Sequence, residues 1–386
     1  MPWEEKTVNQ SRSEFVIEAI EAEYSFSKLC EKYKITRKTG YKWLNRYKSG
    51  ETLSNQSRKP FHSPNKTPDK TEKLILNERS LHPVWGARKL KKSLENKGFS
   101  ELPSTSTISD ILKRNNCISN EESQKHKPYI RFEKEKPNQL WQVDFKGDFA
   151  MLDNLRCYPL TVLDDHSRFN LAISAKLNQQ GIGVFKTFTY LFNEYGIPDC
   201  ILSDNGNPWG NSQCTGFTRF EIWLMQLDIL PIHGRPRHPQ TQGKEERFHR
   251  TMKAELLMQV PILNIKHAQE KFDIYRNEYN NERPHEALGL DVPAQHYKAS
   301  TRKFSAKVES FEYSEPRNLR KIRGNGYITY RSKEHYLSEA LIGEYVNLVP
   351  SSVPNQMKVQ YRNFNIARID LDKNKVIDKR IYPIKP

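Results

Sequence analysis

The sequence predicts a multidomain α+β protein with two N-terminal helix-turn-helix modules, a mixed α/β core and a small β-rich C-terminal domain. Three observations support this prediction. The basic N-terminal third reads as short capped helices, the middle as three strands followed by alternating helices and strands, and the stretch beyond about residue 305 as β-rich segments. The expected domains cover residues 11–52, 66–118, 137–300 and 310–372.

Composition indicates a negatively charged partner and no membrane. The 386 residues carry a formal net charge of +16. Residues 1–136 hold 28 Lys and Arg against 18 Asp and Glu, which favours a polyanionic partner over a merely well-solvated surface. The sequence predicts neither a membrane-spanning helix nor a signal peptide. Five cysteines without Cys-x-x-Cys spacing indicate a reducing, cytoplasmic compartment, with no zinc knuckle or disulfide framework.

The first module reads as three short helices. Ser11 to Glu14 form a capping box ahead of the first helix, and Ser25 can cap a second one. A tight turn follows, and Thr36 can cap a third helix, residues 37–48, that Gly50 closes. This spacing is typical of a helix-turn-helix, although any three-helix bundle with a solvated face would look similar.

The third helix of this module has two different sides. Trp43, Leu44 and Tyr47 share the side expected to be buried, and Asn45 lies on the basic side opposite. That basic side is suited to a DNA major groove, and its candidate DNA contacts are Arg37, Lys38 and Lys42.

The second module repeats this plan after a basic, proline-rich linker. Thr67 and Pro68 predict a helix start, and a second helix follows residues 82–87 and ends at Gly98. A third helix begins near Ser104. Two modules in tandem would read a longer DNA site than one.

Three acidic residues in the core are candidates for a divalent-metal site. Asp144 lies in an alternating strand, Asp204 ends a later apolar run, and Glu246 lies in the first turn of a helix. If the first and fourth strands are neighbours, both aspartates reach the sheet end that faces this helix. Clustered carboxylates repel one another, and two Mg²⁺ ions held by them can support in-line attack on a phosphodiester. A solvated edge-strand aspartate and unrelated surface acids are the alternatives.

Several motifs, in this order, resemble the catalytic core of retroviral integrases and bacterial insertion-sequence transposases. They are Trp141-x-Val143-Asp144-Phe145, Val162-Leu163-Asp164-Asp165-His166-Ser167-Arg168, Ser203-Asp204-Asn205-Gly206 and His238-Pro239-Gln240-Thr241-Gln242-Gly243-Lys244-x-Glu246-Arg247-Phe248-His249. Residues 82–90 and 103–112 resemble the second helix-turn-helix of the same transposases. The resemblance implies a ribonuclease H-like α/β core, residues 137–300, with an Asp-Asp-Glu triad.

The resemblance also assigns residues. It implies Asp144, Asp204 and Glu246 as catalytic and metal-binding residues, and helical phase agrees because Glu246 lies off the buried side while Glu245 lies near it. Swapped roles for the two glutamates stay open, because the family usually has an apolar residue at the position of Glu245. Asp164 and Asp165 resemble a structural feature of the strand end. The remaining candidate DNA contacts, which an ordinary solvated basic stripe would also produce, are Arg88, Ser104, Lys113, Gln242, Lys244, Arg250 and Lys253.

The function implied is that of a bacterial, nucleoid-associated DNA transposase in the cytoplasm. It would bind transposon terminal repeats and catalyse phosphodiester hydrolysis and strand transfer into target DNA with two Mg²⁺ or Mn²⁺ ions. It would act as a homo-oligomer on double-stranded DNA, with an accessory ATPase as a further candidate partner. A domesticated, non-catalytic DNA-binding regulator is the main alternative, and a retroelement integrase and a general nuclease are weaker ones.

Overall fold

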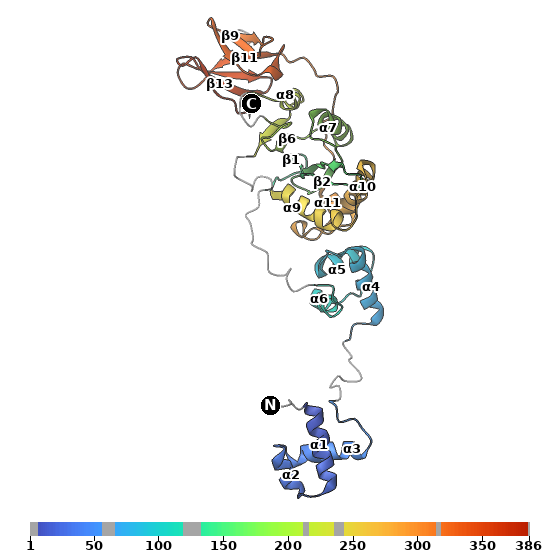
Figure 1. Ribbon diagram of the computed structural model, residues 1–386. Coiled ribbons are helices and arrows are strands. Elements are labelled where there is room, and N and C mark those ends of the chain that lie inside the picture. The colour runs from blue at the N-terminus through green and yellow to red at the C-terminus, as the bar shows by residue number, and fades with distance from the viewer. Residues whose placement is uncertain are drawn as a thin grey trace. The chain divides into compact units, whose positions relative to one another are not determined.

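The computed structural model describes residues 7–55, 66–118, 133–210, 216–234, 243–313 and 318–384. The chain divides into two compact units, Met1–Lys66 and Thr67–Pro386 (Figure 1). The predicted fold class is confirmed, because helical modules, a mixed α/β core and a β-rich C-terminal part follow one another along the chain. Within the six described ranges, no helix is long and apolar enough to cross a bilayer.

The first unit is a three-helix module made of α1 (Val8–Glu21), α2 (Phe26–Lys32) and α3 (Arg37–Lys48). Its core joins all three helices through buried Phe15, Val16, Leu29, Cys30, Trp43 and Leu44. As predicted, Ser25 and Thr36 take the N-cap positions of α2 and α3, and the Thr36 side chain accepts a hydrogen bond from the Thr39 amide.

Two predictions for this module are wrong. The first helix starts at Val8 instead of after Ser11, because Thr7 and Gln10 form a complete capping box one turn earlier. The predicted domain start at residue 11 therefore cuts into α1. Tyr47 does not belong to the buried side of α3, since it is 51% exposed.

The second unit begins with another three-helix module, α4 (Asp69–Leu81), α5 (Ala87–Asn96) and α6 (Thr105–Arg114). Ser104 is the N-cap of α6 as predicted, and its hydroxyl accepts from the Thr107 amide at 3.3 Å. The module's core consists of Ile75, Trp85, Leu90, Leu94, Ile108, Ile111 and Leu112.

The central sheet has the strand order β5-β4-β1-β6-β7. Its strands are β1 (Trp141–Phe145), β4 (Leu160–Asp164), β5 (Asn170–Ser174), β6 (Cys200–Ser203) and β7 (Leu230–His233). The first three form the predicted antiparallel meander, and β6 and β7 add in parallel. The first and fourth core strands, β1 and β6, are therefore neighbours, which is the condition for both aspartates to reach the same sheet end.

Helices cover both faces of this sheet. α7 (Gly181–Tyr195) and α8 (Arg219–Gln226) pack on one face, where Trp141 and Val143 of β1 are buried. α9 (Gly243–Met252) and α10 (Ile265–Asn281) pack on the other. Since side chains alternate along a strand, Gln142 and Asp144 point towards the α9 face.

Smaller elements complete the core. A hairpin of β2 (Phe149–Ala150) and β3 (Arg156–Cys157), which the sequence did not predict, lies on the α10 side. Helix α9 ends at Met252, and the helical segment continues as a π-helical turn, η3 (Lys253–Leu257). The short helices η4 (Glu286–Leu288) and α11 (Pro293–His296) follow α10.

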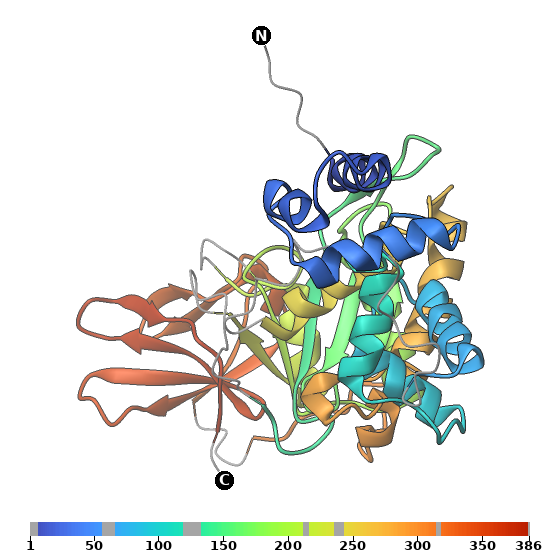
Figure 2. The same cartoon turned by 90° about the horizontal axis from the view of Figure 1, so that it is seen from below.

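The C-terminal part is a β domain that packs on α8 (Figure 2). Its strands are β8 (Leu319–Lys321), β9 (Tyr327–Tyr330), β10 (Lys333–Tyr336), β11 (Tyr345–Pro350), β12 (Gln356–Tyr361), β13 (Phe364–Asp370), β14 (Lys375–Asp378) and β15 (Tyr382–Pro383), with η6 (Glu339–Leu341) between β10 and β11. The last two strands, β14 and β15, both pair with β13. The domain therefore extends past its predicted end at residue 372.

Candidate active site

The two aspartates lie on neighbouring strands. β1 and β6 run parallel with Trp141 opposite Ile201 and Gln142 opposite Leu202. Continuing this register by two residues brings Asp144 level with Asp204, at the carboxyl ends of both strands. Asp144 points to the α9 face because Val143, next to it, is buried on the other face.

Asp204 lies in the turn that follows β6 and is exposed. Its Oδ1 accepts a hydrogen bond from the Gly206 amide at 3.0 Å, which shapes the turn. Its backbone carbonyl accepts from His233 Nδ1 at 2.9 Å, and His233 Nε2 donates to Glu221 at 2.9 Å. Burial is the largest single influence and lowers the pKa of His233, but the hydrogen bonds to Glu221 and to the Asp204 carbonyl, together with the negative charges of both residues, raise the pKa overall.

The two adjacent glutamates of α9 have opposite environments. Glu246 is exposed, whereas Glu245 is completely buried, as helical phase predicted. Glu245 Oε2 accepts from the Thr161 hydroxyl at 3.1 Å, and Glu245 Oε1 has no hydrogen-bond partner among the described residues. Burial, followed by the charge of Asp144, raises the pKa of Glu245 well above its ordinary value. Glu245 therefore favours a protonated form that is not available as a free metal ligand.

His249 and Thr161 connect Glu245 to Asp144. His249 Nε2 lies 2.7 Å from the Thr161 hydroxyl, and His249 Nδ1 lies 3.8 Å from Asp144 Oδ2. Burial lowers the pKa of His249 to about 3, so the ring is neutral at pH 7. Neither residue was assigned a role from the sequence. The spacing of His249, one helical turn after Glu245 on the same helix face, was the only available signal.

Asp144 shows that the three acids influence one another. Burial raises its pKa to about 7, and the negative charges of Asp204 and Glu246 add to the increase. Across the described ranges, no three His, Cys, Asp or Glu side chains are gathered closely enough to hold a metal ion as they stand. The chemistry of the donors nevertheless fits a hard divalent cation, because a positive charge would offset the negative charges of Asp204 and Glu246 that raise the pKa of Asp144.

Asp164 and Asp165 are structural, as expected. Both are fully buried, and Asp164 accepts hydrogen bonds from the backbone of Asn138 and Ser167. Asp165 forms an ion pair with Lys244 Nζ at 2.7 Å. The interpretation of Lys244 as a DNA contact therefore needs correction, because its ammonium is engaged by a buried carboxylate and its side chain is only 15% exposed.

The other candidate DNA contacts keep accessible positions. On α3, Arg37, Lys38 and Lys42 are exposed, and Arg37 donates a hydrogen bond to Ser27. Gln242 lies outside the described residues. The exposed candidates of the second unit are Arg88, Ser104, Lys113, Arg250 and Lys253, although Ser104 also caps α6.

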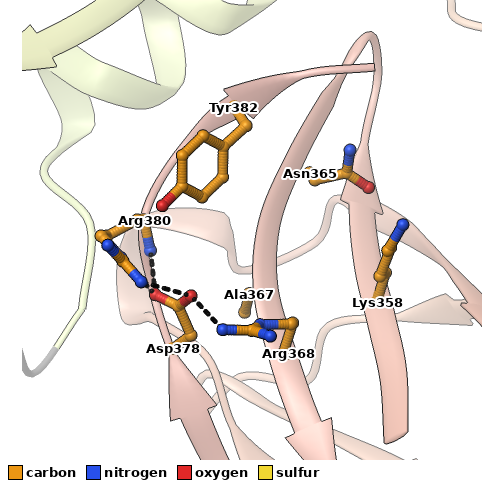
Figure 3. A pocket seen from close by; sticks show the side chains of 7 residues that line it. All are labelled: Lys358, Asn365, Ala367, Arg368, Asp378, Arg380 and Tyr382. Carbon is orange, nitrogen blue, oxygen red and sulfur yellow. Dashed lines mark hydrogen bonds and ion pairs between the residues drawn. The ribbon is translucent and has the colours of Figure 1, made fainter. Parts of the chain in front are cut away.

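A second basic surface occurs on the C-terminal domain. Figure 3 shows a hollow of about 360 Å³ whose lining residues are Lys358, Asn365, Ala367, Arg368, Asp378, Arg380 and Tyr382. Asp378 holds both guanidinium groups, with Arg368 at 2.9 Å and Arg380 at 3.0 Å. Much of the positive charge in this hollow is therefore neutralised internally.

Comparison with known proteins identifies two kinds of domain in this chain. Sequence models of the integrase core domain match residues 134–239 and 227–293, and a homeodomain-like domain matches residues 39–112. Residues 134–293 therefore form an integrase core domain. The integrase core thus coincides with the central sheet, and the homeodomain-like match includes α3, α4, α5 and most of α6.

Proteins of bacterial insertion elements and a retroviral polyprotein are among the relatives of this chain. It is 29% identical to the uncharacterized 39.2 kDa protein of insertion element IS476 from Xanthomonas euvesicatoria, over 41% of this chain and 44% of that protein. It is 24% identical to the uncharacterized 31.7 kDa protein of insertion element IS407 from Burkholderia multivorans, over 41% of this chain and 55% of that protein. It is 31% identical to the Gag-Pro-Pol polyprotein of Mason-Pfizer monkey virus, over 30% of this chain and 6% of the polyprotein. The chain thus spans about half the length of the curated insertion-element relatives it matches.

Two of the solved structures similar to this chain are retroviral. The HTLV-2 integrase catalytic core domain in complex with magnesium is 17% identical with a TM-score of 0.33, covering 42% of this chain and 99% of that one. The simian T-cell lymphotropic virus intasome in complex with PP2A regulatory subunit B56 gamma is 16% identical with a TM-score of 0.37, covering 81% and 96%. Likeness at these TM-scores supports no conclusion about the activity of this chain.

Proposed function

We propose that this chain is a DNA transposase that binds transposon terminal repeats and catalyses metal-dependent phosphodiester hydrolysis and strand transfer. One observation carries the proposal. Within an integrase core, Asp144 lies level with Asp204 on the adjacent strand, and its pKa is raised to about 7 with contributions from Asp204 and Glu246. A regulator that only binds DNA would have no use for two acidic side chains whose charges disfavour the ionised form of Asp144.

The solvent exposure of the acidic side chains indicates which of them would hold metal ions. Asp144, Asp204 and Glu246 would hold two divalent cations, Mg²⁺ or Mn²⁺, which supply Lewis acidity for attack by water or a 3′-hydroxyl. Glu246 is the better third ligand because it is exposed, whereas Glu245 is buried against Thr161. Glu245 instead lies behind Asp144, with the Thr161 hydroxyl 3.1 Å from Glu245 Oε2 and 3.1 Å from the Asp144 carbonyl.

DNA binding is assigned to the basic helices. The exposed face of α3 would enter a major groove, and the second module would extend the site. Arg250 and Lys253, exposed and one to two turns after Glu246, could hold the DNA end close to the triad. Two transposon ends have to be held together for joining, so we propose a homo-oligomer on DNA. No observation on this chain supports an accessory ATPase, and the proposal does without one.

The experiment is strand transfer of a labelled transposon-end duplex into plasmid DNA with Mg²⁺ or Mn²⁺. Wild type is compared with Glu246→Gln and Glu245→Gln, a matched pair of isosteric changes on adjacent residues. We expect Glu246→Gln to abolish joining, with a loss of at least about 100-fold, and to leave end binding intact. Glu245→Gln should retain most of the activity, because a neutral amide can replace a protonated carboxyl.

Other outcomes would contradict parts of the proposal. Loss of joining only in Glu245→Gln would move the third ligand by one residue. A wild-type chain that binds the ends but never joins them would favour the domesticated regulator.

A further inference from the structure

Asp204 is connected to the C-terminal β domain by a series of hydrogen bonds that includes one peptide link, from Phe217 to Thr218. The series passes from Ser338 of the β domain to the backbone of Phe217, then through Thr218 and Glu221 at the start of α8, and reaches the Asp204 carbonyl through His233. Every residue in it lies in the described part of the chain, and none is needed to bind DNA or metal in the proposed function.

The C-terminal end of this series is tightly packed. The Ser338 side chain is 2% exposed, and its hydroxyl accepts from the Phe217 amide at 2.9 Å and donates to the Phe217 carbonyl at 3.0 Å. Gly216 leaves room for this contact, since a Cβ there would lie 2.9 Å from Ser338 Oγ. Phe217, Ile222 and Met225 are buried in the hydrophobic core of the β domain. The start of α8 is therefore fixed from the C-terminal side.

Glu221 connects α8 to β7. It is the acidic partner of the Thr218 capping box, and its Oε2 accepts from the Thr218 amide at 2.6 Å. Its Oε1 accepts from His233 Nε2 at 2.9 Å. Glu221 is 5% exposed, so this carboxylate has both oxygens occupied in a buried place.

His233 is the last residue of β7 and fixes the turn that carries Asp204. Its Nδ1 donates to the Asp204 carbonyl at 2.9 Å and lies 3.3 Å from the Ser203 hydroxyl. The ring packs against Gly210, where a Cβ would lie 3.0 Å from His233 Cε1. Because the two ring nitrogens face a carboxylate oxygen and a carbonyl oxygen, these contacts and the packing against Gly210 fix the orientation of the ring.

We propose that Glu221 and His233 are positioning residues for Asp204, held in place by the C-terminal domain through Ser338. This inference rests on the proposed function of Asp204 as a metal ligand. The Asp204 side chain is exposed and follows the last residue of β6, so the sheet itself does not fix it. Partners behind a metal ligand set its orientation, and their loss typically lowers metal affinity or activity about 10–100-fold.

The experiment compares His233→Gln, His233→Asn and Ser338→Ala with wild type in the full chain. Mn²⁺ binding is followed by electron paramagnetic resonance, hydrogen exchange by mass spectrometry over residues 203–210, and strand transfer as kcat and KM for the end duplex. His296→Gln and Ser351→Ala are the matched controls, because His296 pairs with Asp291 and Ser351 is a loop serine elsewhere in the β domain.

We expect His233→Gln to speed exchange over residues 203–210 and to lower Mn²⁺ affinity and kcat about 10–100-fold, with KM unchanged. His233→Asn should recover most of the loss, because its amide nitrogen can occupy the place of Nδ1 and donate to the Asp204 carbonyl. Ser338→Ala should change the same quantities in the same direction by a few-fold, and neither control should change them.

The inference is overturned if His233→Gln leaves exchange and Mn²⁺ affinity at wild-type values, or if His233→Asn is no better than His233→Gln. An unchanged Ser338→Ala variant that unfolds like wild type would remove the link to the C-terminal domain. Failure of the proposed function looks different. The wild type would then join no DNA, while faster exchange over residues 203–210 in His233→Gln would still support the positioning role.

Discussion

At the scale of single residues, Asp144 shows a conflict between burial and charge. Its ordinary pKa of 3.8 rises to about 7, through burial first and the charge of Asp204 second. A carboxyl whose pKa is higher in the folded than in the unfolded state stabilises the fold below pH 4. That stability is lost as pH rises from about 4 to about 7, because the folded state then holds a charge it disfavours.

Asp144→Asn should therefore stabilise the metal-free protein at high pH. In EDTA at pH 8 we expect the free energy of unfolding of Asp144→Asn to exceed that of wild type by up to roughly 4 kcal/mol. Solvent screening of the partly exposed carboxylate reduces this difference. Near pH 4 the two proteins should unfold alike. Urea unfolding from pH 4 to 8 measures this, and added Mn²⁺ should close the gap by stabilising wild type alone. A constant difference across this pH range would show that Asp144 does not titrate as stated.

Lys244 gives a second prediction at this scale. Lys244→Met leaves Asp165 charged and unpaired at 0% exposure, and breaking such a pair typically destabilises a fold by about 3–5 kcal/mol. We expect a clear drop in the unfolding midpoint. Arg250→Ala, an exposed change on the same helix, should lower DNA affinity with no change in midpoint. Equal midpoints for Lys244→Met and wild type would restore Lys244 as a surface DNA contact.

At the scale of elements, Gly40 determines how α3 packs in the first module. Alanine normally stabilises a helix interior relative to glycine by about 0.5–1 kcal/mol. A Cβ at Gly40, however, would lie 2.9 Å from Cys30 Sγ and 3.0 Å from the rings of Phe15 and Phe26. Gly40→Ala should thus destabilise this module by about 1–3 kcal/mol.

Amide hydrogen exchange over α1 to α3 in the full chain measures that effect. Asn45→Ala, at an exposed position of the same helix, is the control and should slow exchange slightly through better helix propensity. Slower exchange in Gly40→Ala would mean that helix propensity outweighs the contact.

Local chemistry explains which elements the sequence could predict. Thr36 and Ser104 were found because a cap needs only a side-chain oxygen three residues before an amide, and the burial of Glu245 followed from helical phase. The ion pair of Lys244 could not be found this way, because Asp165 is 79 positions away and the contact depends on the fold. Short strands such as β14 and β15 carry too few residues for a periodic pattern, and pairing with β13 creates them.

At the scale of the whole molecule, the net charge of +16 predicts a strong salt dependence of DNA binding. The logarithm of the binding constant falls by about 0.9 per phosphate contact for each unit of log salt. Lys38→Ala should reduce this slope by about 0.9 on end-duplex DNA. Lys32→Ala is the matched control, because its ammonium is paired with Glu18 in the same module. Fluorescence anisotropy at several salt concentrations measures both slopes, and equal slopes for Lys38→Ala and wild type would exclude a phosphate contact at Lys38.

The π-helical turn Lys253–Leu257 has a consequence for how this family can vary in length. A π turn closes one residue later than an α turn, so one residue can leave it and ordinary helix results. The residues on both sides of the turn would keep their facing, because the turn holds one residue more than the α-helical segment that would replace it. Glu246 lies before the turn and would keep its place. A single-codon deletion behind the third acid would thus be absorbed by the helix itself, and the spacing of the triad would be preserved.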